Sequence, residues 1–140
     1  MQAYLIDSSI YIFRSYFTLP DNWKSVDLGF STHAVYGFTT FLLDLLRQKD
    51  PAYLFCAFDE SLGSGFRHKL CPDYKANREL PDEGLAFQLN ACRQLCRVLG
   101  VSEMASEIYE ADDLIGAVAE NTRSANAQPV VVTRDKDLTQ

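Results

Sequence analysis

Acidic residues recur where predicted secondary-structure elements end or begin, and their types and spacing are suited to metal chemistry. Single or paired aspartates follow three apolar runs, and a further acidic cluster opens a late helical segment. The seven carboxylates are Asp7, Asp59, Glu110, Asp112, Asp113, Asp135 and Asp137. Carboxylate oxygens are the ligands that Mg²⁺ and Mn²⁺ prefer, and no histidine or cysteine lies inside these groups to indicate zinc. Two such ions about 4 Å apart can activate a water and bind a phosphate, so the pattern predicts metal-dependent phosphodiester hydrolysis.

The elements that must position these acids alternate between strand and helix. Apolar, β-rich runs predict strands over residues 3–6, 53–58, 101–105 and 129–133. Helical apolar spacing, caps and stops predict helices over residues 8–17, 33–48, 81–99 and 111–121, with a loop over 19–30. This alternation predicts one α/β domain over residues 1–140, built on a mostly parallel sheet whose ligands lie at the carboxyl ends of its strands.

Bringing seven carboxylates to one sheet edge has an energetic cost. The charges repel and raise one another's pKa values, which costs several kcal/mol unless cations neutralise them. Each acid also has a purely structural alternative. Asp7 and Asp135 can cap helices, and Asp112 and Asp113 can offset a helix dipole. The repetition of acids after successive strands favours metal binding for the set.

One basic segment stands out against the formal net charge of -6. Residues 66–78 read FRHKLCPDYKANR, a segment that contains four lysines and arginines but only one acidic residue, an aspartate. Such a segment can contact a phosphate backbone, and the alternative interpretation is a solvated loop. We interpret His68 as a surface or phosphate contact and His33 as the residue that starts a helix.

The remaining features exclude several classes of protein. The four cysteines, Cys56, Cys71, Cys92 and Cys96, contain no C-x-x-C pair and predict buried free thiols. No apolar run approaches the roughly 20 residues of a membrane span, and the start of the chain lacks the layout of a signal peptide. We therefore expect a cytoplasmic protein without a membrane partner.

Several ordered motifs resemble those of one nuclease family. They are LIDSS (residues 5–9) with Arg14, AVYGF (34–38), FD (58–59), FRHKL and YKANR (66–70 and 74–78), EADDLIG (110–116) and TRDKDL (133–138). Together they resemble the N-terminal part of bacterial and phage 5′-to-3′ exonucleases and flap endonucleases, as in the 5′ nuclease domain of DNA polymerase I. The resemblance implies a three-layer PIN-like α/β fold, with the seven carboxylates as the metal-site acids.

The resemblance also implies roles for basic and aromatic residues. Arg14, Tyr74 and Lys75 correspond to catalytic positions near the scissile phosphate. DNA contacts are implied for Arg14, Arg67, Lys69, Tyr74, Lys75 and Arg78, and residues 75–99 correspond to a helical arch over the 5′ end. The family usually has glycine at the positions of Arg134, His33 and Tyr109. In the family, a further acidic pair and a helix-hairpin DNA-binding region follow the last motif.

These observations predict a Mg²⁺- or Mn²⁺-dependent enzyme that hydrolyses DNA with 5′ ends or 5′ flaps, with two ions in the complete site. Two alternatives remain open. A PIN-type endoribonuclease would use a similar acidic edge, and a non-catalytic nucleic-acid-binding module would retain the fold without cleavage.

Overall fold

The computed structural model describes residues 1–26, 29–59, 83–106 and 109–133. This part of the chain forms four strands and four helices. The strands are β1 (Gln2–Asp7), β2 (Tyr53–Asp59), β3 (Ser102–Ser106) and β4 (Gln128–Val132). The helices are α1 (Ser8–Thr18), α2 (His33–Lys49), α4 (Glu83–Leu99) and α5 (Ala111–Ser124). None of the helices in the described ranges is long and apolar enough to cross a membrane.

The strands form one sheet in the order β3-β2-β1-β4, and every pairing is parallel. Leu5 in the central strand β1 lies opposite Phe55 of β2 and Val131 of β4. Because all strands run the same way, their carboxyl ends meet at one edge of the sheet. The predicted parallel sheet is therefore confirmed, with no antiparallel strand among the described residues.

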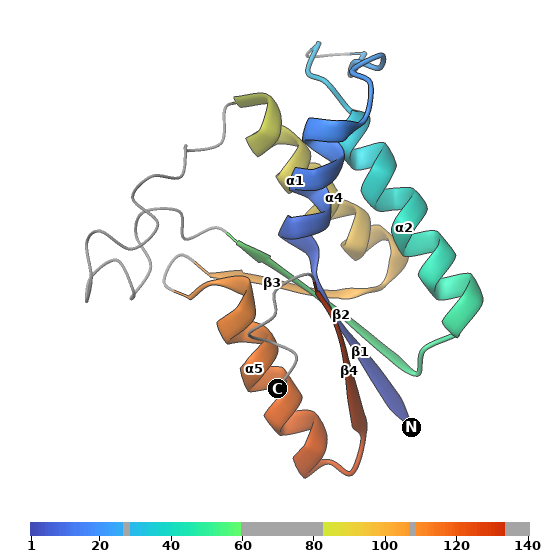
Figure 1. Cartoon of the computed structure of the whole chain (residues 1–140), viewed down its shortest axis with the longest axis vertical. Helices are drawn as coiled ribbons and strands as arrows, with labels where there is room; N and C mark the ends of the chain where they lie inside the picture. The colour runs from blue at the N-terminus through green and yellow to red at the C-terminus, as the bar shows by residue number, and fades with distance from the viewer. Residues whose placement is uncertain (27–28, 60–82, 107–108, 134–140) are drawn as a thin grey trace.

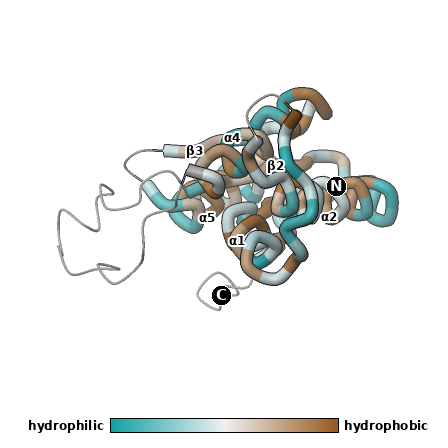
Figure 2. The backbone as a smooth tube through the Cα atoms, turned by 90° about the horizontal axis from the view of Figure 1, so that it is seen from above, coloured by the Kyte–Doolittle hydropathy of each residue, from teal (hydrophilic) through white to brown (hydrophobic). Residues whose placement is uncertain are grey.

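Helices cover both faces of the sheet and give three layers, as predicted. Helices α1, α2 and α4 lie on one side, and α5 lies on the other (Figure 1). Along each strand, successive side chains alternate between the two faces. Ile6 and Phe58 pack with the three-helix layer, whereas Leu5 and Ala57 pack with Ile115 of α5. Brown and teal stretches alternate along the helices, as expected for helices that bury one side (Figure 2).

The element boundaries lie close to those predicted. Helix α4 ends before Gly100, whose φ of +74° is the left-handed conformation that favours glycine after a helix. Helix α5 runs three residues beyond its predicted end at 121, because the residues Thr-Arg-Ser extend it until Asn126 adopts a φ of +62°. The predicted start of the third helix at residues 81 and 82 lies outside the described residues.

A buried amide joins two helices of the larger layer. The side chain of Gln88 in α4 is fully buried, and its Oε1 accepts hydrogen bonds from the backbone N–H groups of Ala34 (2.6 Å) and Val35 (3.2 Å). These groups belong to the first turn of α2, where helices lack internal acceptors. Thr32, at the N-cap position, makes no side-chain cap. Gln88 therefore caps α2 from a neighbouring helix.

Helices α1 and α2 approach each other closely. Tyr11 stacks on Phe41 with ring centroids 4.4 Å apart. A Cβ atom added at Gly37 would collide with the side chains of Ser15 and Leu19. The glycine of the AVYGF motif is therefore explained by packing.

The predictions for the histidine and cysteines agree with the structure. His33 begins α2, is buried, and places Nε2 2.8 Å from the carbonyl oxygen of Tyr16. Cys56, Cys92 and Cys96 are free and buried in the core. Cys71 and His68 lie outside the described residues.

Candidate metal centre

Two of the predicted acids end neighbouring strands on the same face of the sheet. Asp7 is the last residue of β1 and Asp59 the last residue of β2. Strand alternation puts Asp7 on the face of Leu5, and Asp59 on the face of Ala57, which is the face covered by α5. Asp7 is 4% exposed and makes no side-chain cap to α1, so helix capping does not explain it.

Three further acids gather at the start of α5. One ligand oxygen from each of Glu110, Asp112 and Asp113 lies within 4.8 Å of the other two. Local hydrogen bonds organise the group: Asp113 Oδ2 accepts from the Glu110 N–H (3.1 Å), and Asp112 Oδ1 accepts from the Asp113 N–H (2.8 Å). The helix N-terminus also favours negative charge. Capping and metal binding are therefore compatible roles for these acids.

Asp59 connects the end of the sheet to this acidic group. Its Oδ1 accepts a hydrogen bond of 2.6 Å from the backbone N–H of Ala111, the first residue of α5. Ala111 is 1% exposed, so this donor has little access to water. The carboxylate of Asp59 thereby holds the start of α5, and with it the acids of the first turn, against the carboxyl end of β2.

Two hydroxyl groups that the sequence analysis did not single out also belong to this edge. The Ser9 Oγ, fully buried at the start of α1, accepts the backbone N–H of Asp59 at 2.8 Å. The Thr133 Oγ1 donates to Asp7 Oδ2 at 3.1 Å. Both residues stand in motifs quoted above, LIDSS and TRDKDL, but their type alone does not distinguish a positioning hydroxyl from an ordinary one.

The structure thus brings five of the seven predicted acids to one region. Glu110, Asp112 and Asp113 form the compact group, and Asp59 joins it through α5, while Asp7 lies on the adjacent strand. Arg14 is exposed on α1, seven residues after Asp7, which corresponds to about 10 Å along the helix axis. The other predicted site residues lie outside the described residues: Arg67, Lys69, Tyr74, Lys75, Arg78, Asp135 and Asp137, together with Arg134.

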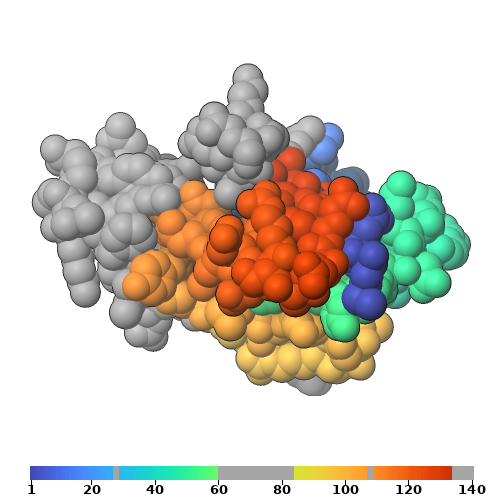
Figure 3. Space-filling view, turned by 90° about the horizontal axis from the view of Figure 1, so that it is seen from below, coloured from blue at the N-terminus to red at the C-terminus, as the bar shows by residue number. Residues whose placement is uncertain are grey.

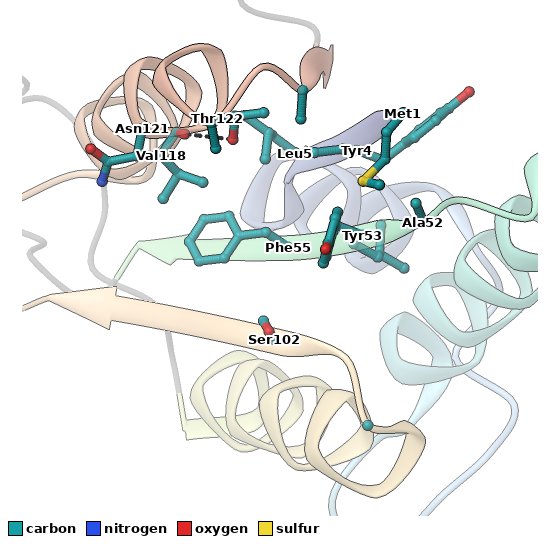
Figure 4. A pocket seen from close by; sticks show the side chains of 15 residues that line it. Met1, Tyr4, Leu5, Ala52, Tyr53, Phe55, Ser102, Val118, Asn121 and Thr122 are labelled. Carbon is teal, nitrogen blue, oxygen red and sulfur yellow. Dashed lines mark hydrogen bonds between the residues drawn. The ribbon is translucent and has the colours of Figure 1, made fainter.

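A cavity of about 640 Å³ lies at the opposite end of the sheet. It is lined by the first residues of β1, β2 and β3 and by the last turns of α5, including Tyr53, Phe55, Val118 and Asn121 (Figure 4). In the view from below, the end of α5 and the start of β4 (orange to red) lie beside the start of β1 (blue) (Figure 3). Among the described residues that line this cavity none has a charged side chain, so it differs from the acidic edge in position and chemistry.

The fold and the site together define an α/β domain with an acidic group at the carboxyl edge of a parallel sheet. The family model described as "5'-3' exonuclease, N-terminal resolvase-like domain" matches residues 2–140. This chain belongs to that family, which confirms the resemblance stated above.

Curated relatives agree with this assignment. The chain is 36% identical over 137 residues to DNA polymerase I of Mycobacterium tuberculosis, covering 97% of this chain and 15% of the polymerase. It is 33% identical over 137 residues to the 5'-3' exonuclease of Aquifex aeolicus, covering 98% of this chain and 46% of that protein. The chain therefore spans less than half the length of these relatives.

Solved structures share the fold. The T5 D15 protein co-crystallised with metal ions superposes with a TM-score of 0.70 at 16% identity, covering 99% of this chain and 50% of that one. The bacteriophage T5 D15 flap endonuclease in a pseudo-enzyme-product complex with DNA and metal ions gives a TM-score of 0.66 at 15% identity, with the same coverage. At these identities the likeness establishes the fold.

Proposed function

We propose that this chain is a metal-dependent 5′-3′ exonuclease or flap endonuclease, which hydrolyses phosphodiester bonds of DNA with 5′ ends or 5′ flaps. The observation that supports this most strongly is the group formed by Glu110, Asp112 and Asp113 beside the carboxyl ends of β1 and β2. The relatives add support, because they include an exonuclease by name and a flap endonuclease crystallised with DNA and metal ions.

The donor set suits a hard divalent cation. All the ligand atoms of the group are carboxylate oxygens, which Mg²⁺ and Mn²⁺ prefer over nitrogen or sulfur. Two oxygens on opposite sides of one Mg²⁺ lie about 4.2 Å apart. A group whose atoms lie within 4.8 Å of one another therefore needs only a small side-chain adjustment to share one ion.

We assign the acids to two ion positions in the complete site. Glu110, Asp112 and Asp113 hold one ion, with Asp7 and Asp59 completing its surroundings, and Asp135 and Asp137 contribute to the other. Bound ions supply a nucleophilic water and stabilise charge on the reacting phosphate. The carboxylates fix where the ions lie, and the hydrogen bond from Ala111 fixes Asp59 relative to the group.

Positive and aromatic residues then orient the DNA. We assign Arg14, Tyr74 and Lys75 to the region of the scissile phosphate, where cationic groups stabilise the charge that grows in the transition state. A tyrosine ring can also stack on an unpaired base. Arg67, Lys69 and Arg78 bind the phosphate backbone, and their contribution weakens as salt concentration rises.

Calorimetry with Mn²⁺ and Mg²⁺ tests the metal site directly. We expect wild-type protein to bind Mn²⁺ and Asp113→Asn to bind it at least 10-fold more weakly. The substitution removes a charge while keeping an oxygen that can accept the Glu110 N–H. Glu120→Gln is the matched control, because it makes the same charge change on the same helix, about two turns away, and leaves binding unchanged. Absence of metal binding by wild type at millimolar concentration contradicts the proposal.

Cleavage assays with the same samples separate the alternative functions. A 5′-flapped DNA and a single-stranded RNA are incubated with Mn²⁺, and we expect products from the DNA alone. Products from RNA alone favour a PIN-type endoribonuclease. Metal-independent binding of DNA without any product favours the non-catalytic binding module.

A further inference from the structure

The last described residue of the chain contacts an acid of the first strand. The register pairs Leu5 with Val131 and Ile6 with Val132, so Thr133 comes beside Asp7 at the carboxyl edge. Thr133 lies on the same face as Val131, which packs with α5. From there its Oγ1 donates a hydrogen bond of 3.1 Å to Asp7 Oδ2.

We propose that Thr133 is a positioning residue that holds the Asp7 carboxylate in the orientation needed for metal binding. The inference rests on the proposed function, in which Asp7 belongs to the metal site. An ionised carboxylate has about four acceptor positions, so accepting one hydrogen bond leaves the oxygens able to coordinate an ion. Groups that hydrogen-bond to a metal ligand, without contacting the ion themselves, typically contribute 10- to 100-fold to metal affinity.

The hydrogen bond to Asp7 is donated by the side-chain hydroxyl of Thr133, so a substitution can remove it. Asp59 is held by the backbone N–H of Ala111, which substitution of the Ala111 side chain leaves in place. The contact to Asp7 comes from a side chain and can be removed by a change of one atom. Asp7 is also 4% exposed, so water offers a poor substitute for the lost donor.

Two substitutions at residue 133 separate the hydroxyl from the methyl group. Thr133→Val keeps the shape of the side chain and removes the donor, whereas Thr133→Ser keeps the donor and removes the methyl. Thr39→Val is the matched control, because its hydroxyl bonds only to the Val35 carbonyl within α2. Mn²⁺ affinity is measured by calorimetry without DNA, and metal-free thermal unfolding checks that each variant folds.

We expect Thr133→Val to raise the Kd for Mn²⁺ about 10-fold or more, with Thr133→Ser and Thr39→Val close to wild type. Equal affinity of Thr133→Val and wild type overturns the proposal, as does an equal loss in the Val and Ser variants, because the Ser variant keeps the hydroxyl. Failure of wild type to bind Mn²⁺ overturns the proposed function and this inference together. Binding by wild type with an unaffected Thr133→Val variant overturns this inference alone.

Discussion

The hydrogen bond from Ala111 to Asp59 makes one predicted metal ligand a structural anchor, and the two roles can be separated by substitution. Asp59→Ala leaves the N–H of Ala111 without this acceptor in a site that is 1% exposed. Losing a helix-capping acceptor costs about 0.5–2 kcal/mol, and stranding a buried donor costs about 1–3 kcal/mol. These two ranges describe the same interaction and are not added, so we expect Asp59→Ala to lower the free energy of unfolding by about 2 kcal/mol.

Asp59→Asn should behave differently in the absence of metal. Its amide oxygen can still accept from Ala111, and loss of the charge relieves repulsion from the carboxylates of α5 while sacrificing about 0.3–1 kcal/mol of interaction with the helix dipole. We expect its stability to stay within about 1 kcal/mol of wild type. Both variants should lose affinity for Mn²⁺.

Thermal unfolding in EDTA measures the difference. For a chain of this size, 1 kcal/mol corresponds to roughly 2–4 °C, so Asp59→Ala should lower Tm by about 4–8 °C. Asp44→Ala, an exposed acid on α2, is the control and should leave Tm nearly unchanged. A Tm for Asp59→Ala equal to that of wild type would refute the anchoring role, and an equal loss in Asp59→Asn would show that charge matters instead of the acceptor.

Two further predictions concern stability. Gly37→Ala should destabilise the protein by about 1 kcal/mol, because overpacking against Ser15 outweighs the gain in helix propensity. Gly116 has open space around it, so Gly116→Ala should stabilise the protein by up to about 1 kcal/mol. Chemical denaturation tests both substitutions, and stabilisation by both would contradict the packing argument. Glu103→Gln should lower the free energy of unfolding by about 1–2 kcal/mol at pH 7. Two arginines of α4 bond this carboxylate, but one of them is exposed to solvent and therefore contributes less. Burial acts to raise the pKa of Glu103, but the hydrogen bonds from these arginines lower it overall, so its contribution is present above its ordinary pKa of 4.5 and is lost as pH falls below that value. The free energy of unfolding should be measured between pH 7 and pH 3, and the difference between Glu103→Gln and wild type should narrow below pH 4.5. A difference that does not change with pH would contradict this role of the Glu103 carboxylate.

Much of the fold could be predicted because local patterns agree with the tertiary structure. The run PVVVT predicted β4, and Gly100 predicted the end of α4, since each follows from local propensity. Placing Asp7 and Asp59 at one edge required only the alternation of strands and helices. The family resemblance supplied the three-layer architecture in addition.

Other features depend on contacts between distant residues, which no local pattern encodes. Nothing about Gln88 in its own helix indicates that it caps α2, because the acceptor and the donors are 53 and 54 residues apart. The same holds for the bond between Ala111 and Asp59, 52 residues apart. The roles of the predicted acids and basic residues stay predictions until metal and DNA binding are measured.

The central position of β1 has a consequence for the order of folding events. Its partner β4 comes from the other end of the described chain, and Thr133 and Asp7 are separated by 126 positions. Contacts between such distant residues require closure of a long loop, which slows folding. During synthesis, β1 and β2 can pair once residue 59 has left the ribosome, but one side of β1 stays open until β4 emerges. The acidic edge is therefore completed late, so a nascent chain has its first strands paired well before it has its full set of carboxylates in place.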